Sequence, residues 1–196
     1  IGKIARDQDN MIVERVRTIR AAVRRMSDAV DNTLAPASIA EGKFAFHPVR
    51  SEIRPILEHV VATQQSIHPA RRFLVDIPHL SQLMIDPAIV EQILENILSN
   101  AIKYSPEDQP IEINCRLQAQ AIIVAITDRG IGVPADDMPK LFSRFFRSSN
   151  ARGVKGTGVG LHAVRFFMGL HSGKVSIKSR EGEGTTVTLS FPLPVG

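Results

Sequence analysis

The stretch that most constrains the fold of this 196-residue chain is one amphipathic segment, residues 89–104. Its apolar residues recur at helical spacing and form one broad stripe: Val90, Ile93, Leu94, Ile97, Leu98 and Ala101. The opposite face carries Gln92, Asn96, Asn100 and Lys103, nearly above one another. Because Asn is a poor helix former, two of them in line with a lysine favour a face that binds an anionic ligand. A solvated back face explains this helix, taken alone, equally well.

The composition is typical of a globular protein with a real core, since 43% of the residues are hydrophobic and 22% are charged. No uncharged apolar run is long enough to span a bilayer, and we recognise no signal peptide. We therefore expect a cytoplasmic location and no membrane contact within this stretch, with anchoring of the parent protein left open. The chain does not begin with Met, which suggests a fragment of a longer protein.

Several chemistries find no support in the sequence. A single Cys115 excludes an internal disulfide and a cysteine-rich zinc site, and its alternation with apolar neighbours predicts a buried strand position. None of the six histidines lies in an H-E-x-x-H motif, and no G-x-S-x-G element is present. A zinc enzyme and a serine hydrolase are therefore disfavoured.

The N-terminal part predicts one long helix over residues 9–35. Apolar residues at 4-3-4-3-4 spacing form a seam that is typical of a coiled coil or helical bundle: Ile12, Val16, Ile19, Val23, Met26 and Val30. One helix cannot bury such a seam alone, so it requires a partner helix. Its basic residues are better explained by a solvated outer face than by nucleic-acid binding. Pro36 ends the helix, and we place the domain boundary in the linker, giving units 1–40 and 41–196.

The compact part predicts a mixture of strands and helices. Strands are expected at 44–49, 72–77, 82–85, 111–117, 121–127, 174–179 and 185–191, and helices at 51–66, 87–104, 134–140 and 159–171. Asp86 is the expected N-cap of the central helix, with Pro87 at its first position. The polar segment 148–157 has no apolar period and is expected to be a mobile loop.

Two glycine motifs point to a nucleotide. In the first, Asp128-x-Gly130-x-Gly132 directly follows a strand, so a flat ligand can approach the backbone and the carboxylate can accept from an amino group such as that of adenine. Taken alone, this motif is better explained as a plain glycine turn. In the second, the G-x-G-x-G of residues 156–160 leads into a helix, where backbone amides can hold phosphate. Its spacing fits neither a Rossmann motif nor a P-loop, which leaves a phosphate-binding lid of another kind.

In order along the chain, these segments resemble the catalytic and ATP-binding domain of sensor histidine kinases, over about residues 44–193. The resemblance is carried by N-I-L-S-N-A-I-K-Y-S at 96–105 (N box), D-R-G-I-G at 128–132 (G1 box), L-F-S-R-F-F-R at 141–147 (F box), G-T-G-V-G-L at 156–161 (G2 box) and G-E-G-T at 182–185. Gyrase, mismatch-repair and chaperone ATPases of the same GHKL superfamily share the N, G1 and G2 boxes. The F box and the end of the N box favour the histidine kinase branch.

The resemblance implies an α+β fold, a two-layer sandwich in which a mixed sheet of about five strands packs on three helices, preceded by the bundle helix. It implies that Asn100 holds Mg²⁺, that Lys103 and Arg147 neutralise phosphate charge, and that Asn96 belongs to the same catalytic group. Asp128 would accept from the adenine amine, with Thr185 near it. The other implied nucleotide-binding residues are Tyr104, Gly130, Gly132, Lys155, Gly156, Thr157, Gly158, Val159, Gly160 and Leu161, with 148–157 as the ATP lid.

The function implied by the resemblance is that of a two-component protein-histidine kinase with ATP and Mg²⁺ as cofactors. The family transfers the γ-phosphate to a histidine on a dimerisation domain, for relay to the receiver domain of a response regulator. The seam helix is similar to the second helix of that domain, so dimerisation through it is expected. The phosphoacceptor histidine, normally followed by an acidic residue, is not recognised in this chain. A catalytically inactive nucleotide-binding scaffold and a GHKL-type ATPase remain alternatives.

Overall fold

The computed structural model describes residues 45–151 and 153–194, so the predicted seam helix and its proposed boundary lie outside the described residues. In chain order the elements are β1 (Val49–Ser51), α2 (Ile53–Ile67), β2 (Phe73–Asp76), β3 (Leu83–Ile85), α3 (Pro87–Tyr104), β4 (Ile111–Gln118), β5 (Ala121–Asp128), α4 (Gly160–Leu170), β6 (Lys174–Arg180) and β7 (Gly184–Pro192), with 3₁₀ turns η1 (Ala135–Lys140) and η2 (Ser149–Ala151).

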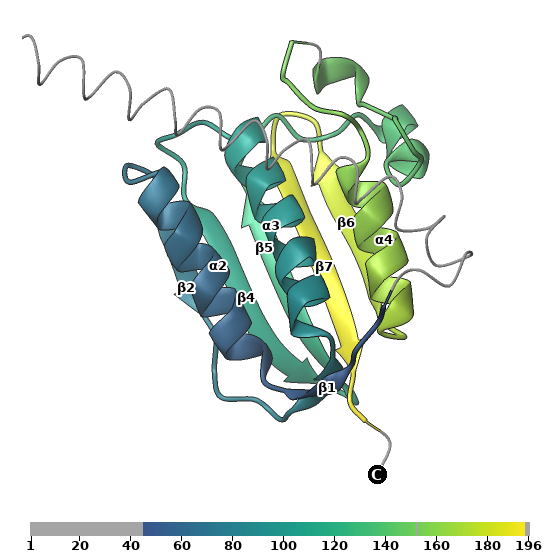
Figure 1. Ribbon diagram of the computed structural model, residues 1–196. Helices are drawn as coiled ribbons and strands as arrows, with labels where there is room; N and C mark the ends of the chain where they lie inside the picture. Colours follow the sequence, from purple (N-terminus) through teal and green to yellow (C-terminus); the bar gives the residue numbers. More distant parts are fainter. Residues whose placement is uncertain (1–44, 152, 195–196) are drawn as a thin grey trace, which may run out of the picture. The chain divides into compact units, whose positions relative to one another are not determined.

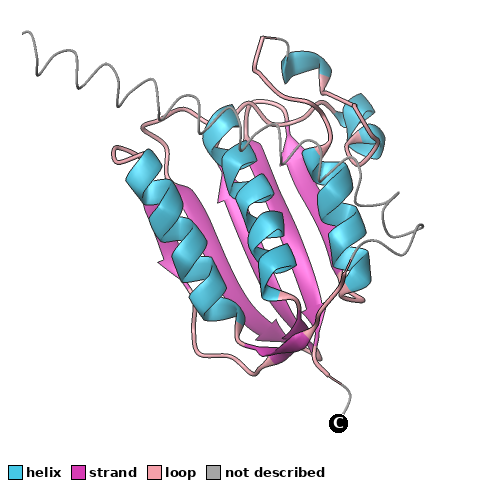
Figure 2. Ribbon diagram, viewed as in Figure 1, coloured by secondary structure: helices cyan, strands magenta, loops and turns pink. Residues whose placement is uncertain are grey.

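The fold has two layers, with α2, α3 and α4 on one face of a five-stranded sheet (Figure 1). The strand order is β2-β4-β5-β7-β6, in which β2 and β4 are parallel and the other neighbours antiparallel. A separate antiparallel pair, β1 and β3, lies at the end of the sheet where α3 begins (Figure 2). This arrangement confirms the expected α+β sandwich of a mixed five-stranded sheet and three helices.

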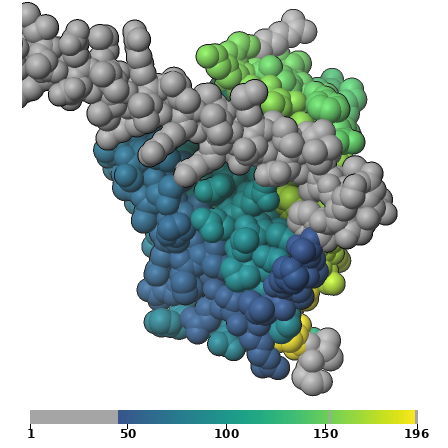
Figure 3. Space-filling model, viewed as in Figure 1, coloured from purple at the N-terminus to yellow at the C-terminus, as the bar shows by residue number. Residues whose placement is uncertain are grey.

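Alternation along the strands creates the two faces of the sheet. In β5, Ile122, Val124 and Ile126 are buried, while the residues between them are only partly covered. The helix α3 covers this face, and its whole predicted apolar stripe is buried: Val90, Ile93, Leu94, Ile97, Leu98 and Ala101. Side chains of α2 and α3 pack next to each other across the helical face (Figure 3). The core therefore lies between α3 and the centre of the sheet.

The start of α3 is fixed by Asp86, as predicted. Its Oδ1 accepts from the amides of Ala88 and Ile89 at 3.1 and 3.4 Å, and Pro87 occupies the first turn. Its Oδ2 accepts from the backbone N–H of His47 at 2.8 Å, which ties the chain entering the domain to this helix. One carboxylate thereby satisfies two amides that α3 leaves unpaired and a third in the chain that enters the domain.

His171, at the end of α4, completes this junction and was not singled out from the sequence. Its Nε2 accepts from the Asp86 amide at 3.1 Å, and its Nδ1 donates to the Phe167 carbonyl at 2.7 Å. The ring packs edge-on against Phe46 and Phe191. Burial lowers the pKa of His171, so the ring is neutral at physiological pH. The starts of α3 and of the described chain are thus joined to the end of α4.

Most expected elements are confirmed to within one or two residues, and one expectation is wrong. The strand expected at 44–49 is Val49–Ser51, because Pro48 has no amide to donate and His47 uses its amide on Asp86. The short helix expected at 134–140 is present as the 3₁₀ helix η1, Ala135–Lys140.

The buried strand position expected for Cys115 is confirmed. Cys115 is buried on β4, and burial raises the pKa of its thiol to about 11. Among the helices that the structure describes, none combines the length and the apolar character needed to cross a bilayer.

Replacing Asp86 tests the junction at the start of α3. Asp86→Ala should lower the free energy of unfolding by about 1–2 kcal/mol, because three amides lose their acceptor. Urea denaturation followed by far-UV circular dichroism measures this change. The matched control is Glu52→Ala, since Glu52 is the N-cap of α2 but makes no side-chain capping bond. Equal losses in the two variants would contradict a specific role for the Asp86 carboxylate.

Candidate functional site

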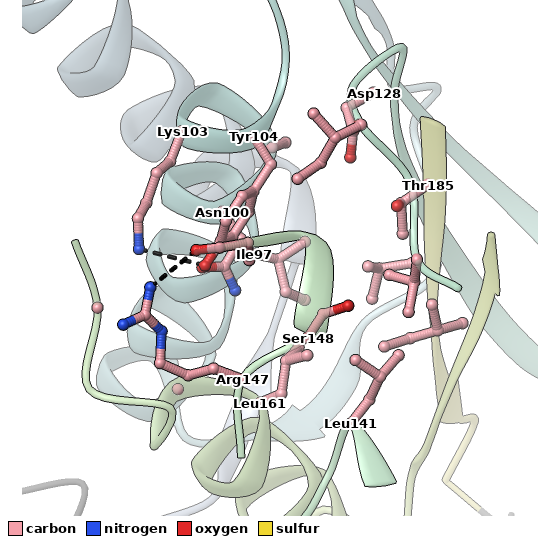
Figure 4. Close-up of a pocket in the computed structure, with 18 of the residues that line it drawn as sticks. Ile97, Asn100, Lys103, Tyr104, Asp128, Leu141, Arg147, Ser148, Leu161 and Thr185 are labelled. Atoms are coloured by element: carbon pink, nitrogen blue, oxygen red, sulfur yellow. Dashed lines mark hydrogen bonds between the residues drawn. The ribbon is translucent and has the colours of Figure 1, made fainter. Parts of the chain in front are cut away.

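A cavity of about 220 Å³ lies at the end of the molecule where α3 ends and α4 begins (Figure 4). Its walls come from α3, the end of β5 and the turn that follows it, the connection from η1 to α4, the start of α4, β6 and the start of β7. The lining residues predicted from the sequence are Asn96, Asn100, Lys103, Tyr104, Asp128, Gly132, Arg147, Gly156, Thr157, Gly158, Gly160, Leu161 and Thr185. Segments up to about ninety residues apart in sequence therefore meet in one site.

The polar face of α3 forms one wall. Asn96 Nδ2 donates to the Gln92 carbonyl at 3.0 Å, which turns Oδ1 toward the start of α4. A Cβ placed on Gly160 would lie 2.8 Å from that oxygen. One turn further, Asn100 also lines the cavity, and Lys103 Nζ lies 3.3 Å from the Tyr104 hydroxyl. Gln92, the first residue of the predicted polar line, lies outside the lining.

Asp128 is the last residue of β5, and the register places it opposite Thr185 of β7. Its side chain is buried, with the residue only 7% exposed. Its Oδ1 accepts from the Gly130 amide at 2.8 Å, and the backbone of Thr185 provides a further hydrogen bond. The turn that follows requires Gly132, whose φ of +61° brings it against the Arg180 carbonyl.

Burial raises the pKa of the Asp128 carboxyl to about 6. The amides of Gly130 and Thr185 and the positive charge of Arg71 act in the opposite direction, because each favours the ionised form. Asp128 is thus an acceptor at neutral pH that water barely reaches. Such a group can select a ligand that brings its own hydrogen-bond donor.

An apolar bed lies between the polar ends of the cavity and was missed in the sequence. It is made by Ile97, Ala101, Ile126, Ile131, Val133, Leu141, Phe146, Ala151, Ile177 and Val187, and the polar Ser148 and Asn150 complete the lining. The alternation along the strands could have predicted part of this bed. Ile126 lies two residues before Asp128, and Val187 lies two residues after Thr185, so each faces the same side of the sheet as its polar neighbour. A flat aromatic ring fits a slot of this kind better than a sugar or an ion does.

The glycine-rich segment forms the rim beside α3. A Cβ on Gly156 would lie 2.6 Å from Lys103 Nζ, so the loop passes directly over that ammonium group. Gly158 has a φ of +72° and lies against the Phe145 and Phe146 backbone. The helix α4 then begins at Gly160 with Val159 as N-cap, a residue whose side chain has no acceptor for the first amides. These amides remain available to an anion in the cavity.

Polar contacts with η1 and with the Asp128–Gly132 turn hold the start of the connection 141–159. Asp137 accepts from Ser148 Oγ and from the Ser149 amide at 2.8 and 2.7 Å, and these bonds lower the pKa of its carboxyl. Asn150 Nδ2 donates to the Gly132 carbonyl at 3.1 Å. The segment predicted as a mobile loop therefore contains the turn η2 and is anchored at its start to the Asp128–Gly132 turn.

Arg147 makes contact with the same segment. Its Nη2 donates to the Ala151 carbonyl at 3.0 Å and also to the Val154 carbonyl. Figure 4 shows Arg147, Lys103 and Asn100 toward one end of the cavity, and Asp128 and Thr185 toward the other. The cavity is therefore polarised, with two cationic side chains at one end and one carboxylate at the other.

Three of the predicted residues do not line the cavity. Lys155 is exposed, whereas Gly130 and Val159 are buried behind the lining. Among the described residues, no group of three or more His, Cys, Asp or Glu side chains could hold a metal ion. A cation in this cavity would depend on amide oxygens, such as that of Asn100, and on oxygens of a ligand.

The part of the chain that forms this cavity is similar to known proteins. Residues 85–195 match the model of the family described as histidine kinase-, DNA gyrase B-, and HSP90-like ATPase. The matched part begins at the last residue of β3 and includes every segment that lines the cavity.

Individual relatives agree with this match. The chain is 39% identical over 119 residues to the sensor-like histidine kinase SenX3 of Mycolicibacterium smegmatis, which covers 60% of this chain and 31% of SenX3. It is 39% identical over 112 residues to the sensor histidine kinase WalK of Bacillus subtilis, which covers 55% of this chain and 18% of WalK. The chain thus spans less than a third of the length of either relative.

Two solved structures have the same fold. The mycobacterial sensor histidine kinase MprB superposes with a TM-score of 0.68 at 25% identity, over 76% of this chain and 99% of that one. The Acinetobacter baumannii histidine kinase AdeS superposes with a TM-score of 0.72 at 18% identity, over 91% of this chain and 84% of that one.

The raised pKa of Asp128 predicts how pH changes the effect of Asp128→Asn on stability. The folded protein binds this proton more tightly than the unfolded chain, whose carboxyl has a pKa of 3.8. From about pH 4 to about pH 6.5, the wild type should therefore lose unfolding free energy relative to Asp128→Asn, by at most about 3 kcal/mol.

Urea denaturation of both proteins at several pH values measures this difference. Asp108→Asn, which makes the same chemical change at an exposed loop position, is the matched control. A difference between wild type and Asp128→Asn that does not change with pH would contradict the raised pKa of Asp128.

Proposed function

Since this chain belongs to the family of histidine kinase-, DNA gyrase B- and HSP90-like ATPases, and carries the ATP-binding catalytic domain of a sensor histidine kinase, we propose that it binds ATP with Mg²⁺ in the cavity described above. The γ-phosphoryl group then passes to a histidine on a dimerisation domain, for relay to a receiver domain. The observation that carries this proposal is the polarised cavity, with a buried carboxylate at one end and cationic side chains at the other.

In this proposal, adenine occupies the Asp128 end. The exocyclic amine donates to the Asp128 carboxylate, and the ring lies on the apolar bed, which includes Ile126 and Val187. Thr185, opposite Asp128 in the sheet register, would contact the same ring edge. A base without an amine at that position would leave a buried carboxylate unpaired, so the site would reject it.

The triphosphate occupies the other end. Lys103 and Arg147 supply positive charge, and the first amides of α4 supply hydrogen-bond donors. Asn100, together with Asn96 on the same wall, offers the amide oxygens that a hard cation accepts. Mg²⁺ bound there would neutralise charge on the phosphate oxygens. Arg147 now donates to carbonyls of the segment 148–157, so phosphate binding would couple that segment to the nucleotide.

Transfer of the phosphoryl group needs position and charge compensation from this domain, and little else. A nitrogen of the acceptor imidazole forms a bond to the γ-phosphorus as the bond to the bridging oxygen breaks, and ADP leaves with that electron pair. None of the histidines in the sequence is followed by an acidic residue, so the proposal places the acceptor on a dimerisation domain outside this sequence.

Nucleotide binding is the first test. Calorimetric titration with a non-hydrolysable ATP analogue and Mg²⁺ should show binding at about pH 7.5. Asp128→Asn should weaken it by about ten- to hundredfold, because a charge-assisted hydrogen bond to the adenine amine is lost. Asn100→Ala should bind with little dependence on Mg²⁺.

The controls are Asp108→Asn and Asn114→Ala, which make the same chemical changes at exposed positions. Both should bind as the wild type does. Binding that is unaffected by Asp128→Asn would show that adenine lies elsewhere, and a wild type that does not bind would leave the domain without its proposed ligand.

Phosphoryl transfer is the second test. With γ-labelled ATP, the chain should label a separately supplied, histidine-bearing dimerisation domain from a related sensor kinase, and Arg147→Ala should slow this labelling by more than about tenfold. A domain whose acceptor histidine is replaced is the control. Steady phosphate release without any acceptor would favour the ATPase alternative, and intact binding with neither reaction would favour an inactive scaffold.

A further inference from the structure

Arg71, in the connection between α2 and β2, is the one arginine that the described chain buries, at 4% exposure. Among the residues that the structure describes, it forms no ion pair with a carboxylate. Its guanidinium donates instead to the carbonyls of Ile102, Ser105 and Gln109 at 2.9, 3.1 and 3.0 Å, to the Pro106 carbonyl and to Ser105 Oγ. A buried cation therefore grips the end of α3 and the loop that follows it.

This end of α3 carries part of the cavity wall. Ile102, which Arg71 contacts, directly precedes Lys103 and Tyr104, and both of these line the cavity. The Tyr104 carbonyl accepts from the Ile131 amide at 3.1 Å, which joins the last turn of the helix to the Asp128–Gly132 turn. A change in the last turn of α3 would therefore displace both the α3 wall of the cavity and the Asp128–Gly132 turn.

Arg71 also acts electrostatically on Asp128. Its positive charge favours the ionised carboxylate and opposes the effect of burial on the pKa of that group. The other charged or titratable groups around the cavity are Lys103 and Tyr104 on α3 and Arg147 before the lid. Of these groups, Arg71 alone is among the causes that shift the pKa of Asp128.

We infer that Arg71 is a positioning residue of the nucleotide site. It fixes the last turn of α3 against the Asp128–Gly132 turn, and its charge stabilises the Asp128 carboxylate that receives the adenine amine. The inference rests on the proposed function, because it assigns Asp128 to the adenine. Arg71 touches no ligand in this assignment. It acts on the site by holding the end of α3 and through the electrostatic effect of its positive charge on Asp128. Arg71 lies outside the sequence motifs that carry the resemblance to histidine kinases.

Three variants separate these effects. Arg71→Gln removes the charge, Arg71→Lys keeps the charge but loses the fork of hydrogen bonds, and Arg72→Gln removes a charge one residue away at an exposed position. For each, ¹³C NMR follows the titration of the Asp128 carboxyl in the ligand-free protein. Calorimetry with the ATP analogue follows affinity from about pH 5 to about pH 8, at a temperature where circular dichroism shows the variant folded.

Arg71→Gln should raise the midpoint of the Asp128 titration and move the loss of nucleotide affinity at low pH upward by the same amount. Its affinity at about pH 7.5 should fall by about fivefold or more, as for other residues that act without touching the ligand. Arg71→Lys should retain the wild-type midpoint even where its melting temperature falls. Arg72→Gln should match the wild type in every measurement.

A purely structural role would give a different pattern. If Arg71→Gln lowers the melting temperature but leaves both the Asp128 midpoint and the affinity of the folded protein unchanged, the inference is wrong while the proposed function stands. An equal change in Arg72→Gln would also overturn it, because the effect would then reflect general surface charge. A wild type that does not bind the analogue would overturn the proposed function and this inference together.

Discussion

The packing of α3 against the sheet is the interaction on which the rest of the structure depends. Its buried stripe forms the centre of the core, and its polar edge, with Asn96, Asn100 and Lys103, forms one wall of the cavity. Because the side chains of one helix are fixed relative to one another, burying the stripe also sets the direction of the polar edge. The packing of α3 that forms the core therefore also fixes one wall of the site.

Asp128 shows how the site works against stability. A carboxylate that is 7% exposed, with a pKa raised to about 6, is a costly group to bury. The two backbone amides and the charge of Arg71 recover part of that cost but leave the carboxylate able to accept another hydrogen bond. A ligand with an amine at the right place would supply it. The cost of burying the Asp128 carboxylate thereby makes the site selective for a ligand that donates a hydrogen bond to it.

Both ends of α3 are held by side chains distant in sequence. At its start, Asp86 and His171 join it to α4 and to the residues that enter the domain. At its end, Arg71 joins it to the α2–β2 connection, and the Tyr104 carbonyl joins it to the turn after β5. Most of these contacts satisfy backbone groups that a helix leaves unpaired at its termini. The central helix is thus fixed at both ends as well as along its buried face, and a shift at one end would be transmitted along a rigid element.

The sequence by itself determined the features that depend on near neighbours. Helical and strand periods predicted the stripe of α3 and most strands, and Asp86-Pro87 predicted the start of that helix. These signals are local because periodicity, capping and turn geometry are decided within a few residues. The register that places Thr185 opposite Asp128 agrees with the expectation that the two lie close together.

Only the tertiary structure decided which distant residues complete these local patterns. Nothing near Arg71 or His171 in the sequence marks either as buried, because Ser105 and Asp86, which they contact, lie 34 and 85 residues away. Lys155 fits the phosphate pattern of its loop, but the path of the chain leaves it exposed outside the cavity. The apolar bed gathers single residues from several elements, and none of them is unusual where it stands. Burial and electrostatic field are sums over the whole fold, so they exist only once the layers have packed.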